Sequence, residues 1–238
     1  MKSFEAFKTA LAESSAGVVQ SFLERRWDDL PGVVRSYFGK RVDLTHVTTS
    51  STEEFAIKLV HGLAAIESSL ECLRDVEAYL AAVPDGVEQL RCIYLLVETY
   101  LNEMVVLRDR VQAYYKCIPK LYRRDPIYPQ LLGVASGISV SFEHLIDEIL
   151  NLEDKHILGE QCRDEHLDVL LALSFYAVRP GEAALGRFEN GTRSVLAGWQ
   201  ANVAGSNRRI FAQLDEGFAA LGAVLISPAG RLIQPRRV

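Results

Sequence analysis

No run of apolar residues in this sequence approaches the roughly 18 residues that a helix needs to cross a bilayer. The first residues, Met1 to Glu5, open directly into amphipathic sequence without the apolar core of a signal peptide. We therefore expect a cytoplasmic protein that is not embedded in a membrane.

Cysteine is scarce and scattered. The four cysteines are Cys72, Cys92, Cys117 and Cys162, and no two of them form a CxxC pair. This spacing excludes a zinc site of the paired-cysteine kind and the dense disulfide framework of small secreted domains. We expect reduced cysteines that lie in the core.

Positive charge is also limited. The chain carries 26 Lys and Arg against 31 Asp and Glu, a formal net charge of −5, and its pI is about 5.6. Such a balance argues against general attraction to nucleic acids or anionic membranes. The net charge does not indicate RNA as a partner. A local basic patch could still bind RNA, so this partner stays open.

The common catalytic and nucleotide-binding motifs are missing. The sequence has no GxGxxG, no GxxxxGK[ST] and no GxSxG. A di-iron bundle needs two Glu-x-x-His motifs, and only Glu153 to His156 supplies one. Asp154, His156, Glu160 and His166 could gather around one ion, but such clusters are common at loop ends, so we predict neither a metal site nor a cofactor.

The composition is that of a folded protein, and the apolar residues recur with a helical period. Of the 238 residues, 49% are hydrophobic and 24% are charged. Ser50 and Glu53 have capping-box spacing. Two series with a period of seven follow: Leu59, Ile66, Leu73 and Leu80, then Leu90, Val97, Met104, Val111 and Ile118. Because only Val83-Pro84-Asp85-Gly86 separates them, we predict an all-α bundle built on a long antiparallel helical hairpin.

Further elements follow the hairpin. Prolines predict a break at Ile118-Pro119 and a connector over 125–129, and apolar spacing predicts helices over 138–152 and 164–177. A fifth helical region runs from 195 to 225 with a break after Gly205-Ser206, and Ser227-Pro228-Ala229-Gly230 predicts the turn of a small C-terminal β-hairpin. The expected organisation is a helical arm (1–49), a bundle (50–226) and a terminal hairpin or tail (227–238), together one structural domain.

Arg108 is unusual because the repeat places it in the apolar seam between Leu101 and Tyr115, where an unpaired charge is unfavourable. Two interpretations stay open. Arg108 either pairs with an acid on an adjoining helix or contacts an anion in a cleft. The second would be a ligand site with Tyr94, Tyr114 and Tyr115, and Glu153 is a further candidate ligand residue.

A polar junction joins the predicted third and fourth helices. His156 and His166 bracket Glu160-Gln161-Cys162-Arg163-Asp164, and loops on a rigid scaffold often carry function. The order of helices, and the segments Phe142 to His156 and Arg163 to Leu167, resemble the HEPN family of helical bundles over about residues 52–178. The resemblance implies a bundle whose active motif, where present, lies at this junction.

Catalytic HEPN proteins cut RNA without a metal, using an Arg followed a few positions later by a His. This sequence has Glu153 where the Arg is expected and Leu158 where the His would fall. The pair Arg41 and His46 has suitable spacing but precedes the hairpin. We therefore expect a non-enzymatic bundle that acts through protein contacts, as a homodimer or with a protein partner. The alternatives are a metal-independent HEPN-like ribonuclease using His156, His166 or Arg41 with His46, and a bundle that binds a small ligand or anion.

Overall fold

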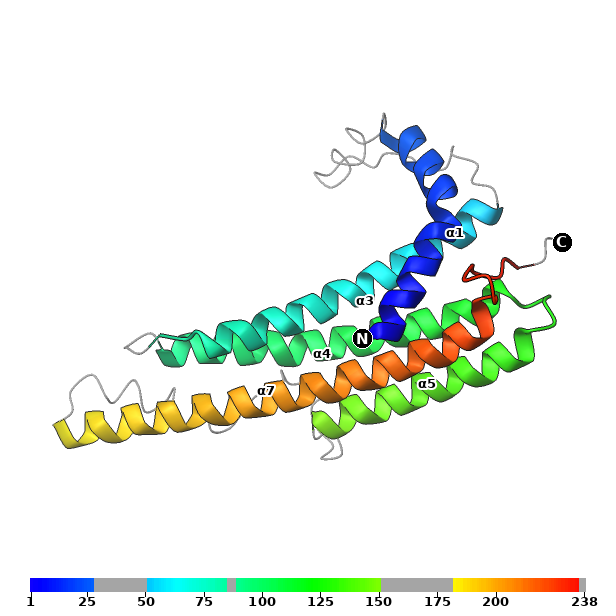
Figure 1. Cartoon of the computed structure of the whole chain (residues 1–238). Coiled ribbons are helices and arrows are strands. Elements are labelled where there is room, and N and C mark those ends of the chain that lie inside the picture. Colours follow the sequence, from blue (N-terminus) through cyan, green and yellow to red (C-terminus); the bar gives the residue numbers. More distant parts are fainter. Residues whose placement is uncertain (28–50, 85–88, 151–181, 236–238) are drawn as a thin grey trace, which may run out of the picture. The chain divides into compact units, whose positions relative to one another are not determined.

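The computed structural model describes residues 1–27, 51–84, 89–150 and 182–235. They form five helices: α1 (Lys2–Trp27), α3 (Ser51–Ala81), α4 (Gln89–Leu121), α5 (Tyr128–Ile149) and α7 (Glu182–Leu225), shown in Figure 1. No strand occurs in these ranges. The prediction of an all-α helical bundle is confirmed.

The chain divides into two compact units. The first comprises residues 1–65, 113–137 and 215–238, and the second comprises residues 66–112 and 138–214. Helices α3, α4, α5 and α7 each contribute residues to both units. The arm, bundle and tail expected from the sequence remain a prediction.

Helices α3 and α4 bury every apolar residue of the two seven-residue series. None of these nine side chains is more than 4% exposed. In the first unit, a Cβ added at Gly62 of α3 would lie 2.5 Å from Cδ2 of Tyr114 on α4, so glycine is what lets the two helices approach there. In the second unit, Arg110 Nη1 on α4 donates to Ser69 Oγ on α3 at 2.6 Å. The predicted hairpin is thus held by packing along its length.

Aromatic rings form the core of the first unit around Phe218 of α7, which is 1% exposed. Its ring centroid lies 4.9 Å from Phe4 and 5.4 Å from Phe7, both on α1, and 5.8 Å from Tyr115 on α4. The backbone N–H groups of Ser3 and Phe4 both donate to Asp215 Oδ1, at 2.8 and 3.0 Å. A carboxylate from α7 therefore caps the positive end of α1.

The C-terminal segment differs from the predicted β-hairpin. The turn is present, with Gly230 at a φ of 74°, but the pairing is a single antiparallel bridge between Ile226 and Leu232. Residues up to Leu225 stay in α7 because their N–H groups are already used in the helix. The segment is instead held by side chains: Leu232 N donates to Ser14 Oγ at 3.0 Å, and the Tyr122 hydroxyl donates to Ile233 O at 2.6 Å.

Two boundaries predicted from proline are wrong. Helix α4 continues through Pro119 to Leu121, because a proline in the last turn removes one hydrogen bond while Ile118 and Pro119 are both buried. Helix α5 begins at Tyr128, inside the predicted connector, and Pro129 occupies its first turn, where no N–H is needed. It ends at Ile149 rather than at 152.

Helix α7 has no break after Gly205 and Ser206, contrary to the prediction. It runs for 44 residues without interruption. A glycine in a helix interior costs about 1 kcal/mol relative to alanine, and the buried side chains of Val203, Ile210 and Leu214 outweigh that loss. The capping residue Ser50 and the helix predicted at 164–177 lie outside the described residues.

Candidate functional site

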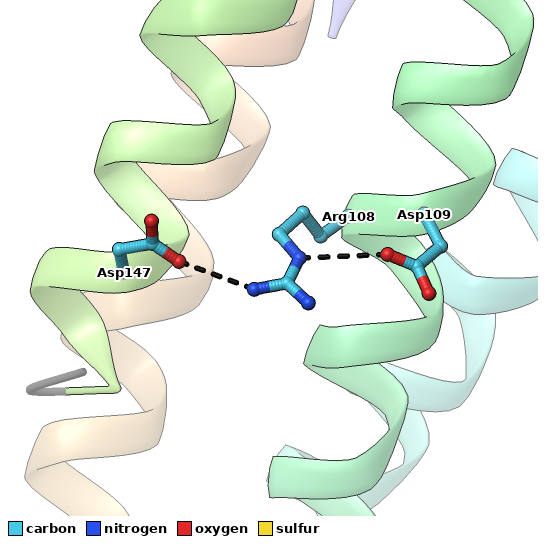
Figure 2. Close-up of polar contacts among 3 residues, drawn as sticks. All are labelled: Arg108, Asp109 and Asp147. Carbon is cyan, nitrogen blue, oxygen red and sulfur yellow. Dashed lines mark hydrogen bonds and ion pairs between the residues drawn. The ribbon is translucent and has the colours of Figure 1, made fainter. Parts of the chain in front are cut away.

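Arg108 lies on α4 in the second unit and forms ion pairs with two carboxylates, as Figure 2 shows. Its Nη1 is 3.2 Å from Asp147 Oδ1 on α5, and its Nε is 3.5 Å from Asp109 Oδ1 on α4. The Arg108 side chain is 16% exposed, whereas Asp147 is 38% and Asp109 is 68% exposed. The guanidinium therefore reaches out of the seam towards acids at the surface.

This geometry matches the structural interpretation of Arg108, an ion pair with an acid on an adjoining helix. A pair with one partner this exposed stabilises by no more than about 1 kcal/mol. An anion would have to compete with Asp147 and Asp109 for the same guanidinium. The anion-binding role of Arg108 stays a prediction that has no further support from these contacts.

Tyr115 lies on α4 in the first unit, whereas Arg108 belongs to the second. Its side chain is 1% exposed, and its hydroxyl has no hydrogen-bond partner in the described part of the chain; the same holds for the hydroxyl of the neighbouring Tyr114. Burial raises the pKa of both phenols far above their usual value. Both therefore stay protonated at neutral pH, and their rings contact Phe218 as core residues.

Removing the Tyr115 hydroxyl is expected to leave the free energy of unfolding unchanged or to raise it by up to about 1 kcal/mol, because a buried hydroxyl without a partner loses its bonds to water on folding. Tyr122 is the matched control, since its hydroxyl donates to Ile233 O. Tyr122→Phe should lower the free energy of unfolding by about 1 kcal/mol. Urea denaturation of Tyr115→Phe and Tyr122→Phe measures both, and an equal loss in the two variants would contradict the assignment.

A buried polar cluster in the second unit was not predicted from the sequence. Asn207 on α7, 1% exposed, donates to Leu73 O at 3.1 Å and to Glu77 Oε2 at 2.7 Å, both on α3. It accepts a hydrogen bond from the Tyr100 hydroxyl on α4 at 3.1 Å. One amide thus connects three helices and fixes their axial register. Its position, four residues after Val203 and three before Ile210, is the sequence signal that could have revealed it.

An uncharged strip runs along the exposed side of α5. We call it the α5 outer face; it comprises Leu132, Gly133, Ser136, Gly137 and Val140, which lie near one another on a helix. All five are exposed, Leu132 at 42% and Val140 at 65%. A Cβ added at either glycine would meet no atom of the described residues within 4 Å. No charged residue occurs from 126 to 142, which is unusual for a helix with an exposed side.

The candidate catalytic residues are not placed by the structure. Arg41, His46, Glu153, His156 and His166 all lie outside the described residues. The polar junction that resembles the HEPN motif lies outside them as well. The roles proposed for these residues therefore remain predictions.

Within the described ranges, no three His, Cys, Asp or Glu side chains are grouped as a metal ion would require. Burial, with Glu103 and Asp75 nearby, raises the pKa of the Cys72 thiol, so Cys72 is not activated as a nucleophile. No described helix is both long and apolar enough to cross a membrane.

Comparisons with family models, with curated proteins and with solved structures found no match to this chain.

Proposed function

We propose that this protein is a non-enzymatic helical protein that associates with a second copy of itself through the α5 outer face. The observation that carries the proposal is the pair Gly133 and Gly137. Each glycine lowers helix stability by about 1 kcal/mol relative to alanine. No described residue needs either glycine, because a Cβ would meet none of them within 4 Å.

The contrast with Gly62 supports this interpretation of the glycines. At Gly62 the ring of Tyr114 occupies the space of a Cβ, so the chain itself accounts for that glycine. At Gly133 and Gly137, four residues apart on α5, the absence of side chains leaves a shallow strip along which another helix can approach closely. Such spacing of small residues permits close contact between helix backbones.

Charge favours a second copy as the occupant. The chain has a net charge of −5, so two copies carry the same net charge, and a contact between them is least opposed where the surface is uncharged. In a twofold dimer the same residues meet across the axis. The α5 outer face contains no charge to repel its own image, and Leu132 and Val140 supply apolar contact. A contact built on one helix is small, so we expect a dissociation constant in roughly the micromolar range.

Replacing both glycines with alanine is expected to weaken association while it raises the stability of the monomer. Gly133→Ala with Gly137→Ala should weaken dimerisation at least about tenfold, because two methyl groups keep the helices apart. The same double variant should raise the free energy of unfolding of the monomer by about 1 kcal/mol per substitution. Light scattering coupled to size exclusion, over about a hundredfold range of concentration, measures the first effect, and urea denaturation of dilute protein measures the second.

Gly198→Ala on α7 is the matched control. Gly198 is also exposed, and a Cβ there would also meet nothing within 4 Å. Its replacement should raise stability by about the same amount per substitution without changing association. A protein that stays monomeric at every concentration, or a control that weakens the dimer as much as the double variant, would show the proposal to be wrong.

A further inference from the structure

A hollow of about 470 Å³ lies in the first unit where α4 turns towards α5. It is lined by Lys120, Leu121, Tyr122, Arg123, Arg124, Asp125 and Pro235. Its volume falls in the range of sites for small molecules, roughly 300 to 1,000 Å³. The lining is dominated by positive charge, in a chain that is acidic as a whole.

Three cations line this hollow, and one acid accompanies them. Lys120, Arg123 and Arg124 are all exposed, and none has an ion-pair partner among the described residues. The carboxylate of Asp125 is engaged locally, since its Oδ1 accepts the N–H of Ile127 at 3.2 Å. Asp125 offsets one of the three positive charges, so the lining stays positive as a whole.

The helix terminus explains part of this charge but not all of it. Cations near the end of α4 interact favourably with the negative end of the helix dipole, which amounts to about half an elementary charge. One cation would be enough to balance it. Three cations close together also repel each other, and a bound anion would relieve that repulsion.

The hollow is held open by contacts that do not involve the cations. Tyr122 is among the lining residues and its side chain is buried, with its hydroxyl donating to Ile233 O at 2.6 Å. That bond holds the segment carrying Pro235, which also lines the hollow. The turn itself is fixed because Asp125 N donates to Tyr122 O at 2.8 Å and Tyr128 N donates to Asp125 O at 3.0 Å. A site formed before binding loses less entropy when its ligand arrives.

We propose that this hollow binds a small phosphate-bearing molecule. Arginine presents a planar fork of N–H donors that matches phosphate oxygens in pairs, and Arg123 and Arg124 supply two such groups. Lys120 adds a point charge at the same rim. Leu121 and Pro235, both partly exposed, give an apolar surface for the remainder of the ligand.

Isothermal titration calorimetry with pyrophosphate as the probe tests this proposal. The full chain should bind one pyrophosphate per protein with a dissociation constant below about 1 mM. Arg123→Gln and Arg124→Gln should each weaken binding about tenfold, since each removes a charge-assisted pair of hydrogen bonds. Arg208→Gln is the matched control: Arg208 is exposed on α7 and lies outside the hollow, so the same loss of charge there should change binding less than about twofold.

Citrate separates phosphate recognition from general attraction to anions. It is a small, multiply charged carboxylate, and we expect it to bind at least about tenfold more weakly than pyrophosphate. Absence of saturable heat with pyrophosphate would overturn the proposal. An equal loss of affinity in Arg208→Gln, or equal binding of citrate, would overturn it as well. Circular dichroism of the variants, whose substitutions are at exposed positions, confirms that each is folded.

Discussion

Replacing Phe218 with alanine is expected to lower the free energy of unfolding by about 3 to 5 kcal/mol. Phe218 is 1% exposed and its ring lies within 6.1 Å of four other aromatic rings, those of Phe4, Phe7, Tyr114 and Tyr115. The substitution removes the buried ring and leaves a cavity that rigid aromatic neighbours cannot fill. Denaturation in urea, followed by circular dichroism, measures the change.

Phe211→Ala provides the comparison within the same helix. Phe211 is only partly buried, and its ring is covered by Arg74, whose Cζ lies 4.9 Å from the ring centroid. Removing the Phe211 ring removes a cation–π contact and some apolar burial, so the free energy of unfolding is expected to fall by about 1 to 2 kcal/mol. Equal losses of stability in the two variants would contradict the larger contribution expected from the buried ring of Phe218.

The change Asn207→Asp is expected to lower the free energy of unfolding by about 3 to 5 kcal/mol at pH 7. The two side chains have almost the same shape, so packing is preserved. The amide that now donates to Leu73 O and Glu77 Oε2 would be replaced by an acceptor that faces both oxygens. A buried carboxylate beside another carboxylate, with only the Tyr100 hydroxyl left to donate to it, is strongly unfavourable.

The loss in Asn207→Asp should depend on pH. Burial and Glu77 would raise the pKa of the introduced carboxyl above its unfolded value of about 3.9. The variant therefore keeps its free energy of unfolding below about pH 4 and loses it as the pH rises through the folded-state pKa of the introduced carboxyl. Urea denaturation of the variant and the wild type at pH 4 and pH 7 measures the difference. Asn202→Asp, at an exposed position on the same helix, is the control and should change little at either pH.

The contrast between Arg108 and Asn207 shows what the sequence can and cannot predict. Arg108 interrupts a regular seven-residue series, so the amino-acid pattern alone marks its position as unusual. Asn207 follows Gly205 and Ser206, a composition typical of loops, and local sequence therefore predicts a break there. What keeps α7 helical is tertiary: the amide finds its partners on α3, 130 and 134 residues away along the chain. The spacing from Val203 and Ile210 marks position 207 as buried, but no local pattern identifies its partners on α3.

The helical hairpin was predictable because its signal is repeated many times, and each buried residue of the series strengthens it. The helix boundaries near Pro119 and Pro129 were not predictable in this way. A proline in the interior of a helix indicates a break, but proline is tolerated in the first turn and in a well-packed last turn. The hollow near Arg123 was missed for a further reason: it requires Pro235, which lies far along the chain.

The capping of α1 by Asp215 has a consequence for synthesis in the cell. The chain leaves the ribosome from its N-terminal end, and domains tend to fold as they emerge. Residues Ser3 and Phe4 cannot find Asp215 and Phe218 until α7 has been made, and Ser14 must wait for Leu232. The first unit is therefore expected to complete its folding only after Asp215, Phe218 and Leu232 have been made, with Phe4 and Phe7 lacking these partners until then.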